Sequence, residues 1–369
     1  MIARDPAAPS RHALALAESP LQLLMTVEAV DAGHVRGPVA VHARRGVPGL
    51  EDAVRAFGTL PLPPTVDLDV RGRVRSTRSG LGASTLVLGD AFSGRAQALL
   101  AARDRWGGGT PGTACRVVVV DDGLATAHLA RVLASAERRP LVRLGVPASA
   151  RRDALGLAAR DGLLRRAELG RLRLVTAFEP PHDVRDALER SGVRIARARL
   201  HWAARVAPAV GGRISEPVVV VGSALVVDGL LRREPYLAWV RALARDGRVR
   251  YLPHRREDAG ALAHVAAIPD VVVDRAGLPI ELRLAGLRPP QRVAALPTSA
   301  IALLPATLAP GVRLDATVPE AGWWAPGVDD DLREHLVSIV RLPGRPAANG
   351  SPGAAGTVAQ GATVRRGEP

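Results

Sequence analysis

Short apolar runs alternate with longer amphipathic stretches along most of this chain. Five runs in the first half have the length and the apolar character of buried strands: 12–17, 39–43, 85–88, 116–120 and 173–176. Helical stretches follow the first four of these runs, at 21–30, 50–57, 96–105 and 125–135. Such alternation is typical of a parallel sheet covered by helices. We therefore predict an α/β fold for the first half of the chain.

The same pattern restarts in the second half. Strand-like runs recur at 217–222, 249–252, 271–273 and 293–295, and helices are predicted at 235–245 and 329–340. The stretch 207–215 contains Pro and Gly and is predicted to be a linker. We therefore expect two domains of similar type, residues 11–213 and residues 217–342.

Two segments do not fit this pattern. Residues 138–171 are rich in Arg and Leu without a clear period, and we expect an insertion or a mobile loop with helical pieces there. Residues 344–369 consist largely of Gly, Pro, Ala and Ser, which is typical of a disordered tail.

The composition adds a strong positive charge to this picture. The chain has 369 residues, 47% of them hydrophobic, so each of two domains can bury a core. The formal net charge is +14, and every basic residue is Arg. Aromatic residues make up only 3%, which is unfavourable for stacking on bases, and no nucleic-acid-binding motif is found. The charge favours an anionic substrate or an anionic membrane face, and we expect no nucleic-acid partner.

The cysteine content and the hydropathy of the chain exclude some classes of protein. The single cysteine, Cys115, precedes an apolar strand and is expected to be buried. It excludes an intramolecular disulfide and a multi-cysteine zinc site, and we predict no metal. No apolar run reaches the roughly 20 residues of a membrane span. The N-terminal segment lacks the pattern of a signal peptide. We expect a cytoplasmic protein, with the inner membrane face as a candidate docking surface.

An acidic pair stands at the end of one predicted strand. Asp121, Asp122 and Gly123 directly follow the apolar run 116–120. In α/β sheets, ligands bind at the carboxyl ends of strands. Adjacent carboxylates there can raise the pKa of one of them, which suits a general base near neutral pH. The same position also suits a helix cap, and the sequence leaves both interpretations open.

A histidine follows a strand of the second half. His254 lies between Pro253 and Arg255, just after the run 249–252. An imidazole beside guanidinium groups suits a phosphate leaving group, because it supplies a proton and they supply charged donors. A solvated surface run is the alternative interpretation of these residues.

Two hydroxyl residues and one carboxylate complete the set of candidates. Thr298 and Ser299 precede the apolar run 300–304, and hydroxyls with free N–H groups at a helix start bind anions. They equally suit an ordinary helix cap. Glu281 supplies a carboxylate of the kind that holds ribose hydroxyls in other nucleotide crevices.

Together these fragments resemble the bacterial sialyltransferases, especially the lipooligosaccharide enzymes of glycosyltransferase family 52 and the related polysialyltransferases. Those families share an acidic pair followed by Gly, then a His-Pro motif, then a Ser/Thr pair, and the order here is Asp121-Asp122-Gly123, His254, Thr298-Ser299. Segments 18–24 and 221–231 are similar to the starts of the two family domains. The chain departs from the pattern where proline precedes His254 and where Thr298 takes the place of a serine.

The resemblance implies an α/β fold of the GT-B type, with two Rossmann-like domains facing a cleft. It also implies an inverting glycosyltransferase of cell-surface polysaccharide biosynthesis. This enzyme would move sialic acid or a related nonulosonic acid from a CMP-sugar to a glycan or glycolipid acceptor. Neither a cofactor nor a metal is required by this chemistry.

The resemblance also assigns roles. Asp121 would be the general base on the acceptor hydroxyl and Asp122 would orient it, while His254 would protonate or stabilise the departing CMP phosphate. The other donor-side residues would be Gly222, Ser223, Pro253, Arg255, Glu281, Thr298 and Ser299. The acceptor-side residues would be Ser19, Gln22, Asp90 and Gly123.

Other functions remain open at this stage. A GT-B enzyme with a different nucleotide sugar, such as a UDP-sugar transferase or an epimerase, would share most of these features. A non-catalytic GT-B fold that binds a glycan or a partner protein is the alternative outside enzymes.

Overall fold

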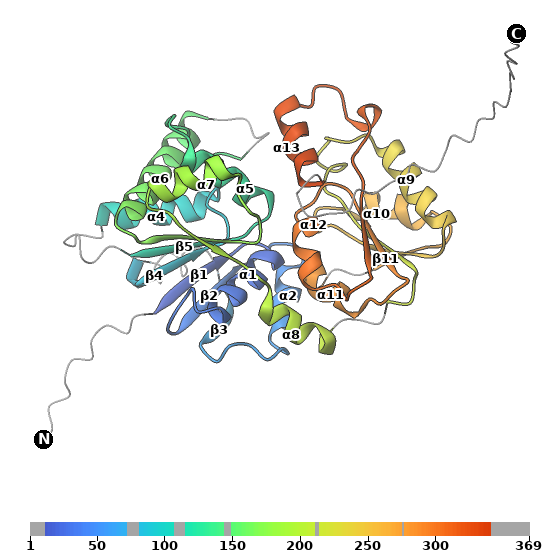
Figure 1. Ribbon diagram of the computed structural model, residues 1–369, viewed down its shortest axis with the longest axis horizontal. Coiled ribbons are helices and arrows are strands. Elements are labelled where there is room, and N and C mark those ends of the chain that lie inside the picture. The colour runs from blue at the N-terminus through green and yellow to red at the C-terminus, as the bar shows by residue number, and fades with distance from the viewer. Residues whose placement is uncertain are drawn as a thin grey trace, which may run out of the picture.

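Two parallel β-sheets lie side by side in the computed structural model, each with helices packed on it (Figure 1). The structure describes residues 12–71, 81–106, 115–143, 149–210, 214–274 and 277–340. The predicted tail, 344–369, lies outside the described residues. The expected α/β class with two similar halves is confirmed.

The first sheet has seven parallel strands in the order β3-β2-β1-β4-β5-β6-β7. The strands are β1 Ala13–Ala17, β2 Val39–Arg44, β3 Val66–Arg71, β4 Thr85–Leu88, β5 Arg116–Val120, β6 Leu172–Thr176 and β7 Arg194–Arg197. The strand order reverses between β1 and β4, which is where open α/β sheets bind ligands. The edge strands β3 and β7 were not predicted, because their apolar positions alternate with Asp or Arg and no continuous apolar run forms.

Helices cover both faces of this sheet. One face carries α1 Pro20–Asp31, α2 Leu50–Phe57 and α8 His201–Val210. The other carries α4 Gly94–Trp106, α5 Leu124–Ala134, α6 Ala150–Glu168 and α7 His182–Arg190. Because both faces are buried, central strands such as β1 are apolar at every position.

The Arg-rich segment 138–171 is built differently from the expected insertion or loop. Most of it forms the 19-residue helix α6, which begins at a Ser149 cap whose side chain accepts a hydrogen bond from the Arg152 N–H. Arg166 on this helix is buried and pairs with Asp104 at 2.6 Å. Buried, paired arginines interrupt the apolar stripe of α6, and this is why no helical period was visible in the sequence.

The predicted linker 207–215 begins inside helix α8, so that part of the prediction is wrong. Trp202 on α8 is buried, stacks on Phe57 at 5.7 Å between ring centroids, and donates its indole N–H to the Pro61 carbonyl at 3.0 Å. The α8 helix therefore belongs to the core of the first domain. Residues 211–213 lie outside the described part of the chain.

The second sheet has five parallel strands in the order β10-β9-β8-β11-β12. The strands are β8 Val218–Val221, β9 Val249–Leu252, β10 Val271–Val273, β11 Arg292–Ala295 and β12 Arg313–Ala316. The helices are α9 Arg233–Arg245, α10 Ala259–Ala266, α11 Ile280–Arg283, α12 Ala300–Leu303 and α13 Asp330–Val340. Strand order reverses between β8 and β11. No described helix is long and apolar enough to cross a bilayer.

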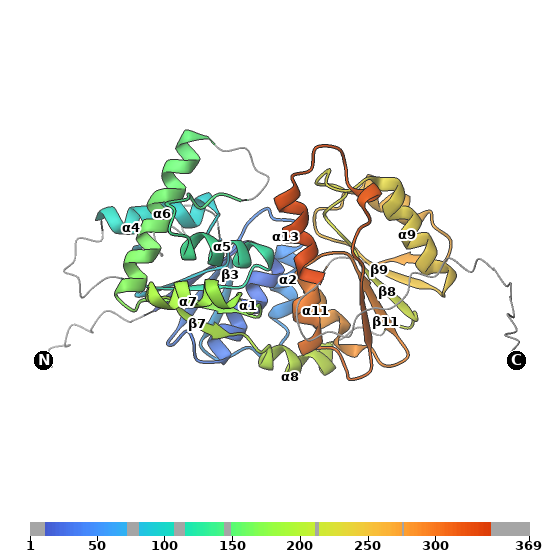
Figure 2. The ribbon, with the colours of Figure 1, turned by 45° about the horizontal axis from the view of Figure 1, so that its top comes forward.

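Among the described residues, contacts join the domains on either side of the space between them. Leu282, Ala285 and Leu303 of the second domain pack into the same apolar cluster as α1 and α8. On the other side, α13 faces the first domain in both views (Figures 1 and 2), and His335 Nδ1 lies 2.8 Å from the Arg131 guanidinium on α5. The ends of the central strands lie between these two sides.

Replacing Trp202 with Ala is expected to destabilise the first domain by about 3–5 kcal/mol, because it leaves a large cavity and an unpaired Pro61 carbonyl. Urea unfolding monitored by circular dichroism measures the change. The neighbouring exposed residue provides the control, since His201→Ala should shift stability by less than about 0.5 kcal/mol. An equal effect of both variants would contradict the assignment of α8 to the core.

Candidate active site

The reversal points of the two sheets face each other and enclose a cavity of about 270 Å³. Ser19 after β1 and Asp122 after β5 line it from the first domain. His254 after β9 and Thr298 after β11 line it from the second. Because carboxyl ends of parallel strands meet at one edge of a sheet, residues far apart in the sequence converge here.

A second cavity of about 500 Å³ adjoins the first. The two share six residues: Asp122, Arg143, Gly222, His254, Thr298 and Ser299. The larger cavity adds apolar side chains from α5 and α13, including Leu124, Leu332 and Leu336. The shared residues therefore stand where the contents of both cavities would meet.

The acidic pair divides into one buried and one accessible carboxylate. Asp121 has no exposed surface and lines neither cavity. Its carboxylate accepts hydrogen bonds from the Thr176 hydroxyl at 2.9 Å, the Ala177 N–H at 2.8 Å and the Gly123 N–H at 2.9 Å. Burial raises the pKa of Asp121 to about 6 despite these bonds. Asp121 therefore ties the end of β5 to the end of β6.

Asp122 points into the cleft instead, with its side chain 12% exposed. Its N–H donates to the Thr126 hydroxyl at 2.8 Å, and the Ser19 hydroxyl donates to Oδ1 at 3.4 Å. Burial and the nearby Asp90 carboxylate raise the pKa of Asp122 to about 7, against the opposing effects of Gln22 and Arg143. A carboxylate with this pKa in an open cleft can accept a proton near neutral pH.

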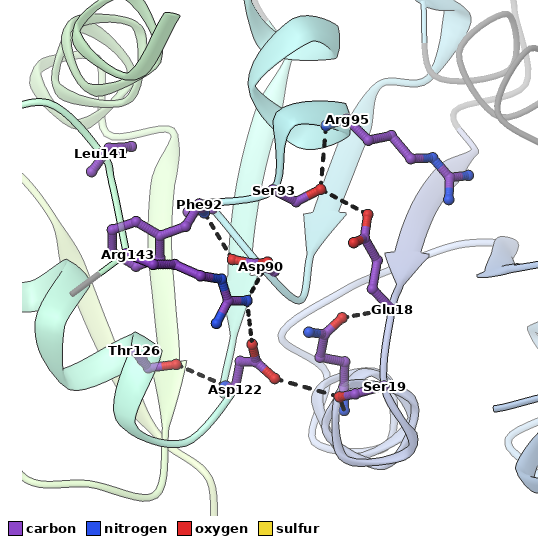
Figure 3. A network of polar contacts seen from close by, with 12 residues as sticks. Glu18, Ser19, Asp90, Phe92, Ser93, Arg95, Asp122, Thr126, Leu141 and Arg143 are labelled. Carbon is purple, nitrogen blue, oxygen red and sulfur yellow. Dashed lines mark hydrogen bonds and ion pairs between the residues drawn. The ribbon is translucent and has the colours of Figure 1, made fainter. Parts of the chain in front are cut away.

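Arg143 is a residue of the site that the sequence did not indicate. Its guanidinium lies 2.6 Å from Asp90 and 3.6 Å from Asp122, between the two carboxylates (Figure 3). The Phe92 N–H fixes the other oxygen of Asp90 at 2.8 Å. Arg143 belongs to the Arg-rich segment without a period, so nothing in the sequence distinguished it from its neighbours.

Three predicted acceptor-side residues support the site from outside the cavities. Gln22 and Asp90 are buried and are not lining residues. Gln22 Oε1 accepts the Glu18 N–H at 2.6 Å, which fixes the start of α1. Gly123 has φ of +69°, and a Cβ on it would lie 2.4 Å from Ser299 Cβ. Only glycine allows the two domains to approach this closely.

His254 is held in one tautomer by the backbone N–H of Arg256. The Arg256 N–H donates to His254 Nδ1 at 3.2 Å, so the proton of the neutral ring resides on Nε2. Burial, then Arg256 and Arg255, lower the pKa of His254 to about 4. The ring is therefore neutral at pH 7 and offers an N–H donor. The flanking residues Pro253 and Arg255 also line the smaller cavity.

The remaining donor-side residues surround the same space. Glu281, at the start of α11, is 3% exposed, and burial raises its pKa to about 7. Gly222, Thr298 and Ser299 line both cavities. Ser223 lines the larger one, where its hydroxyl accepts the Leu225 N–H at 3.2 Å. Among described residues, no group of three or more His, Cys, Asp or Glu side chains is arranged to hold a metal ion.

No family model and no curated protein matches this sequence. Solved structures do match: LpCGTa in complex with UDP has a TM-score of 0.50 at 12% identity, over 90% of this chain and 83% of that one. An α/β-galactoside α-2,3-sialyltransferase from the luminous marine bacterium Photobacterium phosphoreum has a TM-score of 0.49 at 9% identity, over 89% of this chain and 94% of that one. A Photobacterium 2,6-sialyltransferase solved with CMP and lactose has a TM-score of 0.47 at 12% identity, over 89% of this chain and 75% of that one. The chain has the two-domain GT-B fold.

Replacing Asp122 with Asn is expected to stabilise the free protein at pH 8 by about 1–3 kcal/mol. The folded protein holds the Asp122 proton more tightly than the unfolded chain, whose pKa is near 3.8, so the charged carboxylate lowers stability as pH rises through about 7. Thermal unfolding at pH 8 and at pH 4 measures the gain, which should vanish at the lower pH.

The control is Asp330→Asn, because the Asp330 side chain is 94% exposed and its replacement should change stability at neither pH. A loss of stability in Asp122→Asn at pH 8 would show that the ion pair with Arg143 outweighs the burial of the charge.

Proposed function

We propose that this chain is a metal-independent, inverting glycosyltransferase that moves a nonulosonic acid, such as sialic acid, from a CMP-sugar to a glycan or glycolipid acceptor. The observation that carries the proposal is the convergence of Asp122 and His254 on one cavity from opposite domains. A base from one side and a phosphate-binding donor from the other suit a displacement reaction between them.

Asp122, rather than Asp121, takes the role of general base in this proposal. Asp121 is enclosed and its oxygens already accept three hydrogen bonds, so an acceptor hydroxyl has no access to it. Asp122 lines both cavities and has a pKa near 7. The acceptor oxygen would form a bond to the anomeric carbon as the bond to the CMP phosphate breaks, with the hydroxyl proton passing to Asp122.

The departing phosphate would be stabilised from the second domain. Neutral His254 would donate its Nε2–H to a phosphate oxygen, and the Thr298 and Ser299 hydroxyls would donate further bonds. Arg255 lines the same cavity, and its guanidinium would add a charged donor to the leaving group. Glu281 would hold the ribose hydroxyls of the nucleotide.

The identity of the donor rests on the order of the motifs. An acidic pair with Gly, a histidine and a hydroxyl pair follow one another as in the family 52 sialyltransferases, which favours CMP. The larger cavity, which shares Asp122, would receive the acceptor. A glycolipid acceptor would bring this basic chain to the anionic inner face of the membrane.

Calorimetric titration with CMP is expected to give micromolar binding, with UDP at least about tenfold weaker. His254→Ala should weaken CMP binding, because it removes a phosphate donor, whereas Asp122→Asn should keep CMP binding and abolish transfer from CMP-sialic acid. UDP binding in place of CMP would identify a UDP-sugar transferase or epimerase. Absence of binding to either nucleotide by folded protein would favour a non-catalytic role.

The pH dependence of kcat/KM should follow Asp122. Activity is expected to rise as pH increases through about 7, because only the deprotonated carboxylate accepts the acceptor proton. His254 remains neutral until pH falls to about 4, so its titration should not affect the rise of kcat/KM near pH 7. A profile that is flat between pH 5.5 and 8.5, measured at about 0.15 M salt to hold screening constant, would remove Asp122 from the base role.

A further inference from the structure

A four-residue turn presents His254 to the cleft, and three hydrogen bonds close it. The Glu257 N–H donates to the His254 carbonyl at 2.9 Å, and the His254 N–H donates to Glu257 Oε2 at 2.7 Å. The Arg256 N–H donates to the imidazole Nδ1. The backbone and the ring of His254 are thus both fixed within this turn, and the Glu257 carboxylate closes it from beneath.

The second oxygen of Glu257 is held by Tyr251, which in turn pairs with Tyr236, and these are the only two tyrosines of the chain. The Tyr251 hydroxyl donates to Glu257 Oε1 at 2.5 Å and lies 2.6 Å from the Tyr236 hydroxyl. Tyr236 is 2% exposed and Tyr251 has no exposed surface. Phenylalanine at position 251 would leave Glu257 Oε1 and the Tyr236 hydroxyl without the Tyr251 partner, so this hydroxyl links the carboxylate to the tyrosine pair.

Gly222 provides the space that Glu257 occupies. A Cβ on Gly222 would lie 2.4 Å from Glu257 Oε2 and 2.8 Å from the His254 nitrogen. Any side chain at the end of β8 would therefore displace the carboxylate or the turn. The residue after β8 and the turn after β9 are therefore distant in the sequence but fitted closely to each other around the Glu257 carboxylate.

Closing this turn with a buried carboxylate lowers the stability of the folded domain, because burial disfavours the charged form of Glu257. Burial raises the pKa of Glu257 to about 7, and burial also raises the pKa of both tyrosines. A buried charge of this kind lowers stability unless all its partners are present. The arrangement is better explained by the positioning of His254 than by the stability of the fold.

We propose that Glu257 is a positioning residue, which acts through the His254 backbone to keep the Nε2–H edge of His254 directed at the anionic leaving group. The tyrosine pair orients the carboxylate, and the absence of a side chain at Gly222 admits it. The part of this inference that concerns the leaving group rests on the proposed function; the part that concerns the ring does not.

The test separates these two parts with two measurements on the full chain. The first is the ¹⁵N chemical shifts of the His254 ring in histidine-labelled protein, assigned by the signals missing in His254→Ala. Wild-type protein should show a protonated Nε2 and an unprotonated Nδ1, and Glu257→Ala should show a mixture of tautomers. Glu257→Gln should keep the wild-type tautomer, because its amide oxygen still accepts the His254 N–H and its NH₂ can donate to Tyr251.

The second measurement is a double-mutant cycle on CMP binding. Glu257→Ala and His254→Ala should each weaken binding about tenfold, and the double variant should be no weaker than His254→Ala alone. Val240→Ala provides a control for lost stability, since Val240 is fully buried in the same domain but outside the site. It should lower the unfolding temperature and leave the CMP affinity and the His254 signals unchanged.

Additive losses of affinity, or a wild-type tautomer in Glu257→Ala, would overturn the positioning role. If wild-type protein binds no CMP, the proposed function fails, and the tautomer measurement alone then decides whether Glu257 positions the ring. If Glu257→Ala does not fold, Tyr251→Phe takes its place, with a smaller change expected in the same direction because one of the two donors to the carboxylate is lost.

Discussion

The candidate site depends on one close approach, in which the end of β5 meets the start of α12 across the domain boundary. Gly123 sits so near Ser299 that a Cβ would overlap it, and its positive φ is one that other residues rarely adopt. This contact sets the distance between the acidic end of the first sheet and the hydroxyl-bearing end of the second. Asp122 is its immediate neighbour, so the position of that carboxylate in the cleft follows from the same approach.

The rest of the fold supports this contact from two sides. An apolar cluster runs from α1 and α8 into Leu282 and Leu303 of the second domain, while Arg131 meets His335 on the opposite side. Apolar packing therefore supports both sides, because Leu124 of α5 also packs against the apolar cluster of the second domain.

Burial shifts the pKa values of most titratable groups discussed in the candidate site. Asp121, Asp122, Glu257 and Glu281 all have pKa values raised by burial, and His254 has one lowered by burial. Each of these groups favours its neutral form more than it would in water. For the four carboxyl groups this reduces stability as pH rises through their raised pKa values, whereas for His254 it reduces stability only as pH falls below about 6.5. The same effect makes Asp122 a better proton acceptor and keeps His254 a neutral hydrogen-bond donor. Reactivity and stability are therefore opposed at Asp122.

From the sequence alone it was possible to predict the fold class, the central strands and the strand ends that line the candidate site. Strands buried on both faces, such as β5 and β8, are continuous apolar runs, and polar residues after them stand out. Edge strands β3 and β7 and helix α6 were missed, because half-buried elements and buried arginines leave no such run. Only the tertiary structure separated Asp121 from Asp122, brought Arg143 to the pair and placed Glu257 beneath His254. Those relations depend on which direction neighbouring side chains take at a strand end and on contacts between distant segments, and neither is encoded in local periodicity.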